Sequence, residues 1–476
     1  MEKIWLIGTG VMSIEYAKML IALNVEFLAI GQSSENAINF EKQTMHPVIQ
    51  GGLEEFLESN PETPAAVIVT VGVEILAQTK QLLIDYGIKK ILLDSVEIKS
   101  VLTNSLEQKP DYSLFTIIIP TYNRPEYLKR ILSYYESFEV KIIVVDASDE
   151  IFPYLALYKD QIEYRHTLNK DRISRINEIA SLICTPYVLL CADDDFIIPD
   201  AVNRVVSFLQ ENPDYALGEG YIFKFYNQNN DLMCIASSKN MLGVNISEDC
   251  PSKRILYAVT NPVAIFYSVY RTDIFKEMYK SMILNNKTII KHPNLQEMYI
   301  SWYSLIEGKF IVLPLLYQAR EATWNSEGQT STDLKEIIST KKFRKEYNEF
   351  VALVAAHLSK KESISFDNAK NTVEEIIMRA LYVSYPNYYT IRKRIIPEIK
   401  YRLRVIVKYP IKVFLRIIGL YDYTKKIVNK YRIKKHSLKT SIDINAFNPD
   451  DSFDKQDMEQ WKKIRDCIIQ SKASNQ

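Results

Sequence analysis

Apolar runs alternate with helix-like periodic segments along the first hundred residues of the chain. The apolar runs, which predict β-strands, are Lys3–Ile7, Val25–Ile30, Ala65–Val71 and Lys90–Leu93. Between the first two runs, Ile14, Ala17 and Leu20 recur at the spacing of one helix face. Strands that alternate with helices favour a parallel, doubly wound sheet. We therefore expect a Rossmann domain over residues 1–105.

The same alternation starts again after a polar connection and predicts a second α/β domain over residues 113–330. Its predicted strands include Phe115–Ile119, Lys141–Val145, Tyr187–Leu190 and Phe310–Leu313. Residues 331–440 have a helical and basic pattern, and residues 441–476 form a polar tail that we expect to be partly disordered. The predicted fold class is α/β: an N-terminal Rossmann domain, a central Rossmann-like mixed sheet and an α-helical C-terminal region.

Composition bounds the function further. The 59 Lys and Arg residues balance 58 Asp and Glu residues, so no overall charge favours a nucleic-acid partner. The five cysteines have no paired spacing and are expected to be reduced. The chain runs directly from Met1 into a strand, and no apolar run reaches the roughly 18 residues that span a bilayer. We expect a cytoplasmic protein.

Two glycines, Gly8 and Gly10, follow the first strand and precede the first helix. A glycine turn at a helix N-terminus forms a site for anions such as phosphate. This segment resembles the N-terminal dinucleotide-binding domain of the glucose–fructose oxidoreductase and inositol dehydrogenase family. The resemblance implies that Gly8, Gly10, Val11 and Met12 contact NAD(P).

Three departures from that family affect its chemistry. Ser13 replaces the third glycine of the fingerprint, and Gly31-Gln32-Ser33 offers no carboxylate for the ribose. After the fourth strand, Leu93-Asp94-Ser95-Val96 stands where the family has Glu-Lys-Pro. One alternative is a domain that kept its fold for structure or dimerisation, which would make a homo-oligomer. Another is an NAD(P)-dependent sugar oxidoreductase fused to a transferase.

Three consecutive carboxylates, Asp193 to Asp195, follow the apolar strand Tyr187–Leu190. Like charges beside a buried strand are costly unless a cation or hydrogen-bond donors compensate them. Two further polar clusters, 120–126 and 146–149, also follow predicted strands. Ligands of open parallel sheets bind beyond the carboxyl ends of the strands, so the three clusters should converge. The competing interpretation of the aspartates is a solvated acidic turn.

These motifs, in this order, resemble those of family 2-type glycosyltransferases of the GT-A fold. The resemblance implies a nucleotide-sugar donor and Mn²⁺ or Mg²⁺. Residues Pro120, Thr121, Tyr122, Asn123 and Arg124 would line the nucleotide pocket. Asp146, with Ser148 beside it, would accept a hydrogen bond from the base; the alternative for Asp146 is a turn-forming residue. Asp193 and Asp194 would border the ribose and diphosphate, and Asp195, with Asp193, would bind the metal.

An inverting transfer also needs a base that takes the proton of the acceptor hydroxyl. The best candidate is Glu297, near the start of a predicted helix, where a glutamate that only complements the helix dipole is the competing interpretation. Asp273 and Glu219 are weaker candidates. Arg320 has the chemistry to pair with a diphosphate, although a structural or surface role is the favoured interpretation.

The segment 386–439 contains 16 Lys or Arg residues and only two acids, Glu398 and Asp422. Basic residues interleaved with apolar and aromatic ones suit the surface of an anionic membrane. The alternatives are a helical subdomain packed on the enzyme and an oligomer interface. The sequence thus predicts a metal-dependent inverting glycosyltransferase with a glycan, lipid-linked or protein acceptor. A non-catalytic nucleotide-sugar-binding scaffold is the remaining alternative.

Overall fold

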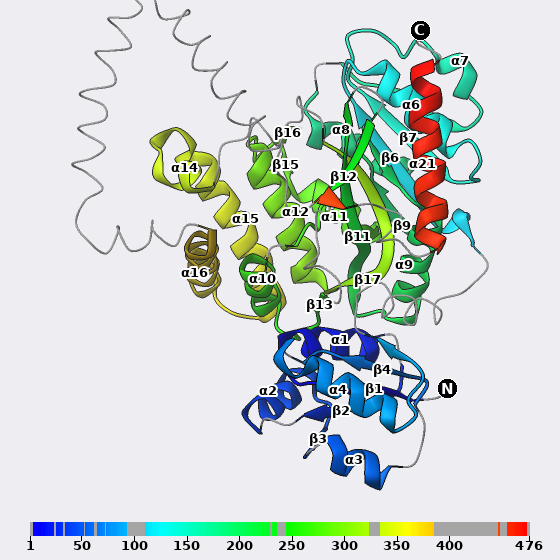
Figure 1. Ribbon diagram of the computed structural model, residues 1–476. Coiled ribbons are helices and arrows are strands. Elements are labelled where there is room, and N and C mark those ends of the chain that lie inside the picture. The colour runs from blue at the N-terminus through cyan, green and yellow to red at the C-terminus, as the bar shows by residue number, and fades with distance from the viewer. Residues whose placement is uncertain are drawn as a thin grey trace, which may run out of the picture.

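Two α/β domains stacked end to end make up most of this computed structural model (Figure 1). The structure describes residues 3–22, 25–31, 34–51, 53–60, 64–71, 73–92, 110–168, 170–228, 231–235, 244–261, 263–322, 334–384, 446–447 and 455–473. Each domain is built on its own sheet, and the second domain carries additional helices at its C-terminal side.

The N-terminal domain has a five-stranded parallel sheet in the order β3-β2-β1-β4-β5. Its strands are β1 (Ile4–Ile7), β2 (Phe27–Gly31), β3 (Val48–Gln50), β4 (Ala66–Val69) and β5 (Ile91–Leu92). Its helices are α1 (Val11–Ala22), α2 (Ser34–Thr44), α3 (Leu53–Ser59) and α4 (Val73–Asp85). The inner strands β1 and β4 are buried along their whole length, which is why they are wholly apolar. The predicted doubly wound parallel sheet is present.

Helix α1 faces the central domain (Figure 1). The side-chain amide of Asn245 donates a 3.0 Å hydrogen bond to the backbone oxygen of Lys18. The Lys18 ammonium in turn lies 5.3 Å from the centre of the Tyr257 ring. Lys18 is only 5% exposed, so this side of α1 is covered by the central domain.

The central domain contains a mixed sheet in the order β10-β17-β11-β14-β9-β6-β7-β8. The strands of this path are β6 (Phe115–Thr121), β7 (Lys141–Asp146), β8 (Ile162–His166), β9 (Tyr187–Leu190), β10 (Asp195–Ile197), β11 (Tyr215–Gln228), β14 (Val269–Arg271) and β17 (Lys309–Glu321). β14 is antiparallel to β9 and β11, and β10 is antiparallel to β17. Smaller strands are β12 (Asp231–Ile235), β13 (Asn245–Ile246), β15 (Ile283–Leu284), β16 (Lys287–Thr288) and β18 (Ala446–Phe447).

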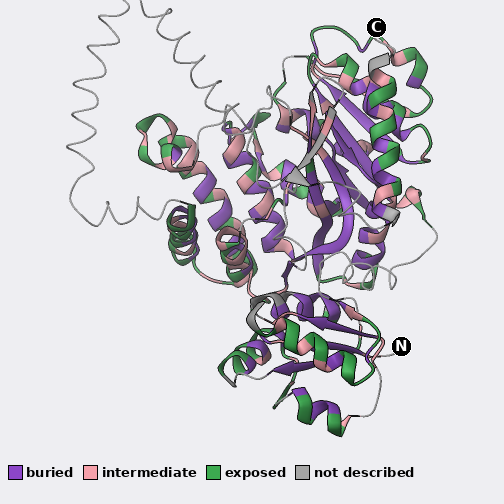
Figure 2. Ribbon diagram, in the orientation of Figure 1, coloured by how far each residue is buried: buried purple, intermediate pink, exposed green. Residues whose placement is uncertain are grey.

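Helices cover both faces of this sheet, which is buried between two apolar layers (Figure 2). One layer contains α8 (Arg172–Ile179), α10 (Pro251–Thr260), α11 (Thr272–Ser281), α12 (Pro293–Glu307), α15 (Arg344–Glu362) and α16 (Phe366–Ser384). The other contains α6 (Pro125–Tyr135), α9 (Pro199–Glu211) and α21 (Lys455–Ala473). Two shorter helices of this part of the chain are α7 (Leu155–Tyr158) and α14 (Leu334–Ser339).

The C-terminal residues differ from the polar, partly disordered tail that the sequence predicts. Residues 455–473 form α21, which lies beside α6 (Figure 1). Trp461, Ile464 and Ile468 recur on one face of this helix and are buried against the sheet. A few apolar residues at helical spacing outweigh the polar composition, because the core of the sheet would otherwise stay exposed on this side.

The basic segment 386–439 lies outside the described residues, and so does its predicted membrane contact. Within the described part of the chain, no helix has both the length and the apolarity to cross a membrane. The predicted helical pattern beyond residue 330 is confirmed by α14, α15 and α16.

Candidate functional site

The three polar clusters predicted at strand ends lie at one edge of the central sheet. Strand β6 lies between β7 and β9 and runs parallel to both, with Thr121 opposite Asp146 and Ile118 opposite Leu190. The chain leaving β9 therefore places Asp193 beside Thr121, whose hydroxyl donates a 2.7 Å hydrogen bond to Asp193 Oδ2. Parallel register brings these distant segments together.

Arg124 links the first two aspartates. Its Nη1 lies 2.8 Å from Asp193 Oδ1, and its Nη2 lies 2.7 Å from Asp194 Oδ2. The planar guanidinium suits this double contact and also stacks on the Tyr127 ring, 4.2 Å from its centre. Both aspartates are buried, whereas the Arg124 side chain is 31% exposed. The contacts between Arg124 and the two aspartates therefore lie at the open side of the site.

Asp195 faces inward instead, toward β17. Gln318 Nε2 donates to Asp195 Oδ2 at 2.9 Å, and the Glu321 backbone N–H donates to Oδ1 at 3.2 Å. Arg320, which pairs with Asp195 in the sheet, holds its Nε 3.7 Å from Oδ2. Asp195 is 1% exposed, so β17 encloses its carboxylate.

The three carboxylates of the cluster are buried, and burial disfavours their charged forms. Burial raises the pKa of Asp193 to about 6, although Arg124 opposes the shift, and Asp194 adds to it. Burial and then the charge of Asp194 raise the pKa of Asp195 well above its ordinary value. A carboxyl pKa rises in this way when the charged form lacks compensation. The cluster therefore fits a hard divalent cation, which prefers oxygen ligands.

The geometry favours some of these carboxylates over others as metal ligands. Among the residues that the structure describes, no group of three or more His, Cys, Asp or Glu side chains is arranged to hold a metal ion. Mg²⁺ bound with substrate phosphates needs only one or two protein carboxylates. Asp195 accepts hydrogen bonds from Gln318 and Glu321, and the two oxygens of Asp193 are likewise engaged, by Thr121 and Arg124. The role of Asp195 as a metal ligand stays a prediction, and Asp194, which lies beside Asp193 at Arg124, is the alternative ligand.

Loop 120–124 and the end of β7 form the walls of a small pocket of about 320 Å³. Its lining includes four predicted donor-binding residues: Thr121, Asn123, Asp146 and Ser148. The Asn123 backbone N–H donates to Ser148 Oγ at 2.7 Å and fixes the loop against β7. Asn123 adopts φ 52°, a left-handed conformation that asparagine tolerates better than most residues.

Asp146 stabilises this wall of the pocket through two hydrogen bonds. Its Oδ1 accepts the Ser148 backbone N–H at 2.7 Å, and its Oδ2 accepts the Tyr164 hydroxyl at 2.6 Å. These contacts match the turn-forming interpretation, and the predicted contact with a nucleotide base stays a prediction. Pro120, the next-to-last residue of β6, is half-buried, whereas Tyr122 is 57% exposed beside the pocket. An exposed aromatic ring offers a surface on which a base can stack.

Glu297 lies in the first turns of α12, at the same edge of the sheet. Helix α12 leads directly into β17, which returns across the sheet to end beside Asp195, so the start of α12 lies near the carboxylates. Burial opposes the raised pKa of Arg320, and the charge of Glu297 contributes to it after those of Asp195, Tyr267 and Asp194. The Glu297 side chain is 51% exposed, and Arg172 Nη1 lies 3.9 Å from its Oε1.

The two weaker candidates for the base are poorly placed. Asp273 opens α11 at the opposite edge of the sheet, where Arg271 pairs with Tyr187 at the start of β9. Glu219 lies in the middle of β11 with 0% exposure, and burial raises its pKa well above the ordinary value. A carboxyl enclosed in the sheet lacks the access that a base needs in order to act on an acceptor.

The predicted cofactor loop of the N-terminal domain has the strand–turn–helix form. Gly8 has φ +118°, and a Cβ there would lie 2.5 Å from Thr70 Oγ1. Gly10 has open space where a Cβ would be, and α1 begins at Val11; the side chains of Val11 and Met12 lie outside the described part. Thr9 packs on Gly31, where a Cβ would lie 2.4 Å from Thr9 Cγ2. NAD(P) binding stays a prediction.

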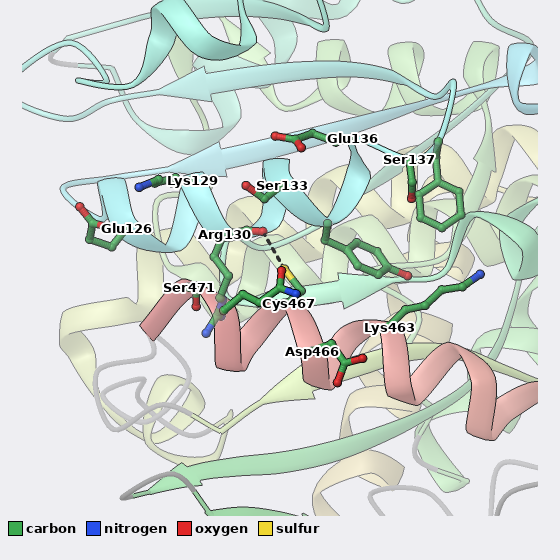
Figure 3. Close-up of a pocket in the computed structure, with 13 residues that line it drawn as sticks. Glu126, Lys129, Arg130, Ser133, Glu136, Ser137, Lys463, Asp466, Cys467 and Ser471 are labelled. Carbon is green, nitrogen blue, oxygen red and sulfur yellow. Dashed lines mark hydrogen bonds between the residues drawn. The ribbon is translucent and has the colours of Figure 1, made fainter. Parts of the chain in front are cut away.

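A separate pocket of about 470 Å³ lies between α6 and α21 (Figure 3). Cys467 of α21 donates a 3.4 Å hydrogen bond to the backbone oxygen of Arg130 in α6. The Arg130 guanidinium reaches the functional site, because Nη2 lies 2.6 Å from Glu321 Oε2 and 3.3 Å from the Asp194 backbone oxygen. Helix α21 therefore supports the scaffold of the carboxylate cluster.

Sequence reasoning missed four residues that position the site: Arg130, Tyr164, Arg172 and Gln318. Gln318 interrupts an otherwise apolar strand and is 0% exposed, so its polarity was a usable signal. Arg172 directly follows Asp171, which caps α8, and nothing local distinguishes it from a surface arginine. The other two act across strands or helices, which the linear pattern does not display.

The mixed sheet, with carboxylates at the ends of neighbouring parallel strands, defines the class of the central domain: an α/β domain of the GT-A type. Residues 116–248 match the model of "Glycosyl transferase family 2", so this part of the chain is a glycosyltransferase domain. The match includes Thr121, Asp146 and all three aspartates.

Solved structures give weaker likenesses. One is S. aureus TarS 1-349 in complex with UDP-GlcNAc, at 13% identity over 59% of this chain and 76% of that one, with a TM-score of 0.42. Another is mannosyltransferase PcManGT from Pyrobaculum calidifontis in complex with GDP-Man and Mn²⁺, at 10% identity over 78% and 89%, with a TM-score of 0.35. TM-scores this low carry no inference about substrates. No curated protein matches the chain.

Proposed function

We propose that this chain transfers a sugar from a nucleotide-sugar donor, with inversion at the anomeric carbon. One observation carries the proposal: within the part matched by the family model, Thr121, Asp146 and Asp193 converge at one sheet edge beside a pocket. Tyr122 would stack on the base, and the Asp193–Asp194 pair would border the ribose and diphosphate.

Glu297 is the proposed base of the reaction. The acceptor hydroxyl oxygen forms a bond to the anomeric carbon of the donor, and its proton passes to the Glu297 carboxylate. The bond between that carbon and the β-phosphate oxygen breaks, and the nucleoside diphosphate leaves with the electron pair. Half exposure at the sheet edge gives Glu297 the access that this role requires.

We propose that Mn²⁺ or Mg²⁺ binds with the donor at Asp193 and Asp194. A divalent cation would stabilise the negative charge that develops on the leaving diphosphate. Arg124 already holds these two carboxylates side by side, and Arg320 places a second guanidinium near Asp195. The acceptor is a glycan, a lipid-linked sugar or a protein, and contact of residues 386–439 with an anionic membrane would suit the second class.

Thermal stabilisation by nucleoside diphosphates tests the donor assignment. UDP, GDP, CDP and ADP are each added to the full chain with Mn²⁺ and with EDTA. We expect one or two of them to raise the unfolding temperature, and Mn²⁺ to enlarge the effect, because binding to the native state stabilises it. The absence of stabilisation by all four, in both conditions, would contradict the proposal. Hydrolysis of the matching nucleotide sugar then identifies the donor.

A further inference from the structure

A second pocket at the same sheet edge lies next to the proposed base. Its volume is about 680 Å³, and it is lined by the start of α8, the β15–β16 hairpin and the first turns of α12. Gln296, which precedes Glu297 in the chain, forms part of its wall. An acceptor has to approach from the side of the base, so the position of this pocket suits the second substrate.

Arg172 contacts both the pocket wall and the proposed catalytic base, Glu297. Its Nη2 donates a 3.1 Å hydrogen bond to Gln296 Oε1, while its Nη1 lies 3.9 Å from Glu297 Oε1. Gln296 is 6% exposed, and its amide also donates to the Ile290 backbone oxygen at 2.9 Å. A ligand held in this pocket would therefore lie against a rigid wall that continues into Glu297.

The lining of the pocket indicates a hydrophilic ligand. Ile283 is the only apolar side chain among the described residues that line it. The other lining residues carry hydroxyl, amide or charged groups, which can bind the hydroxyls of a sugar. Asp171 and Thr288 are joined across the pocket wall by a 2.7 Å hydrogen bond and so help to shape it.

The charges at the rim are positive overall. Lys170 is neutralised by Glu178, with Nζ 2.6 Å from Oε2. Although burial opposes it, hydrogen bonds from Thr288 and Ser174 lower the pKa of Asp171, so this residue stays anionic within the wall. Lys287 and Lys291 are both exposed, and within the described part of the chain neither forms an ion pair. These two ammonium groups are available to a ligand.

We propose that this pocket is the acceptor subsite and that it takes a sugar-containing acceptor carrying an anionic group, which Lys287 and Lys291 bind. This inference rests on the proposed glycosyltransferase function. The anionic group is a phosphate or a carboxylate, and both have the same chemistry toward an ammonium group. Neither lysine touches the carboxylate cluster or the nucleotide pocket, so the two sites are separable by mutation.

Saturation-transfer NMR on the full chain tests the proposal. The sample contains enough of the best-binding nucleoside diphosphate to occupy the donor site. The probes are glucose 6-phosphate, glucuronate and glucose. We expect the two anionic sugars to bind better than glucose, and comparison of the two separates phosphate from carboxylate recognition. In the double variant Lys287→Gln/Lys291→Gln, binding of the preferred anion should weaken about fivefold, since an exposed ion pair contributes modestly.

The matched control is Lys345→Gln/Lys360→Gln, which removes two exposed lysines of α15 outside the pocket. This control should leave binding of the anionic sugars unchanged. Equal binding of glucose and the anions, or anion binding that survives the Lys287 and Lys291 changes, would overturn the acceptor proposal. Nucleotide binding is measured in the same samples: its absence would refute the donor assignment, whereas its persistence in the double variant shows that only the acceptor subsite was altered.

Discussion

At the scale of single residues, the site depends on how each carboxylate is surrounded. Asp193 and Asp194 face Arg124 at the open edge, Asp195 faces β17, and Glu297 is half exposed at the start of α12. Glu219 has the same functional group but lies inside the sheet. Environment, rather than residue type, separates candidates for chemistry from structural carboxylates.

Replacing Glu297 with Gln should lower the rate of sugar transfer by about 10²–10⁴-fold, because the amide takes up no proton. The isosteric change keeps the contact with Arg172, so binding of the nucleoside diphosphate should persist. Steady-state kinetics and calorimetric binding give the two readouts. Asp273→Asn, at the far edge of the sheet, is the control and should have neither effect. Full transfer activity in Glu297→Gln would refute the assignment of the base.

The two candidate metal ligands are distinguished by comparing Asp194→Asn with Asp195→Asn. We expect Asp194→Asn to remove most of the gain in nucleotide affinity that Mn²⁺ provides. Asp195→Asn should mainly destabilise the fold, because it disturbs the hydrogen bonds from Gln318 and Glu321. Calorimetry with and without Mn²⁺, together with urea unfolding, measures both effects. The reverse pattern would restore Asp195 as the principal ligand.

Glu219 should make stability depend on pH. Burial raises its pKa in the folded protein above the unfolded value, so folding favours its protonated form. The stability that protonated Glu219 contributes to the fold is fully present below the unfolded pKa. It is lost as the pH rises through the folded pKa. Glu219→Gln removes this loss, so the variant should gain stability relative to the parent chain as the pH rises above the unfolded pKa of glutamate, about 4.3. A pH-independent difference in urea unfolding would contradict the raised pKa.

At the scale of elements, the returning helix α21 supports the back of the site. Trp461 packs its ring 5.1 Å from that of Phe223, and Gln460 donates to Asp200 at 3.0 Å. On its other side, Cys467 bonds to the backbone of Arg130, whose guanidinium reaches Asp194. A helix that follows 70 residues after α16 thus becomes part of the central domain core.

Trp461→Ala should lower the free energy of unfolding by about 3–5 kcal/mol, because a large buried ring leaves a cavity. Ile469→Ala, on the exposed face of the same helix, is the matched control and should change stability by less than about 0.5 kcal/mol. Urea unfolding followed by fluorescence measures both. Similar small losses in the two variants would mean that α21 contributes little to the core.

At the scale of the whole molecule, a parallel N-terminal sheet and a mixed central sheet belong to two domains that meet at α1. The central sheet carries the carboxylates, whereas the N-terminal sheet carries the glycine turn and contacts the central domain through Lys18. The N-terminal domain therefore has a structural contact whether or not it binds a dinucleotide.

Gly10→Ala tests the dinucleotide site without damage to the fold, because a Cβ at that position meets no other atom. If NAD(P) binds there, the added methyl group should weaken NAD(P) binding severely, since the pyrophosphate has to approach this backbone closely. Sugar transfer should not change. Fluorescence of NADPH on titration measures the binding. Gly8→Ala is the contrasting variant: its φ of +118° and the nearby Thr70 predict a loss of stability.

The sequence by itself determined the elements and the order of the motifs. Periodicity located the strands, and the rule that ligands meet the carboxyl ends of parallel strands predicted that Thr121, Asp146 and Asp193 converge. Those inferences depend on local patterns, so they can be made from the sequence alone. The polar composition after residue 441 was misleading, because three apolar residues at helical spacing were enough to bury one face of α21.

Only the tertiary structure decided how each site residue is surrounded. Three adjacent aspartates look alike in the sequence, yet β17, more than 110 residues later, encloses Asp195 and leaves Asp193 and Asp194 at Arg124. Likewise, the pocket beside Glu297 exists because α8, the β15–β16 hairpin and α12 meet in space. The physical reason is that burial and charge compensation depend on long-range contacts, whereas strand and helix patterns depend on neighbours in the chain.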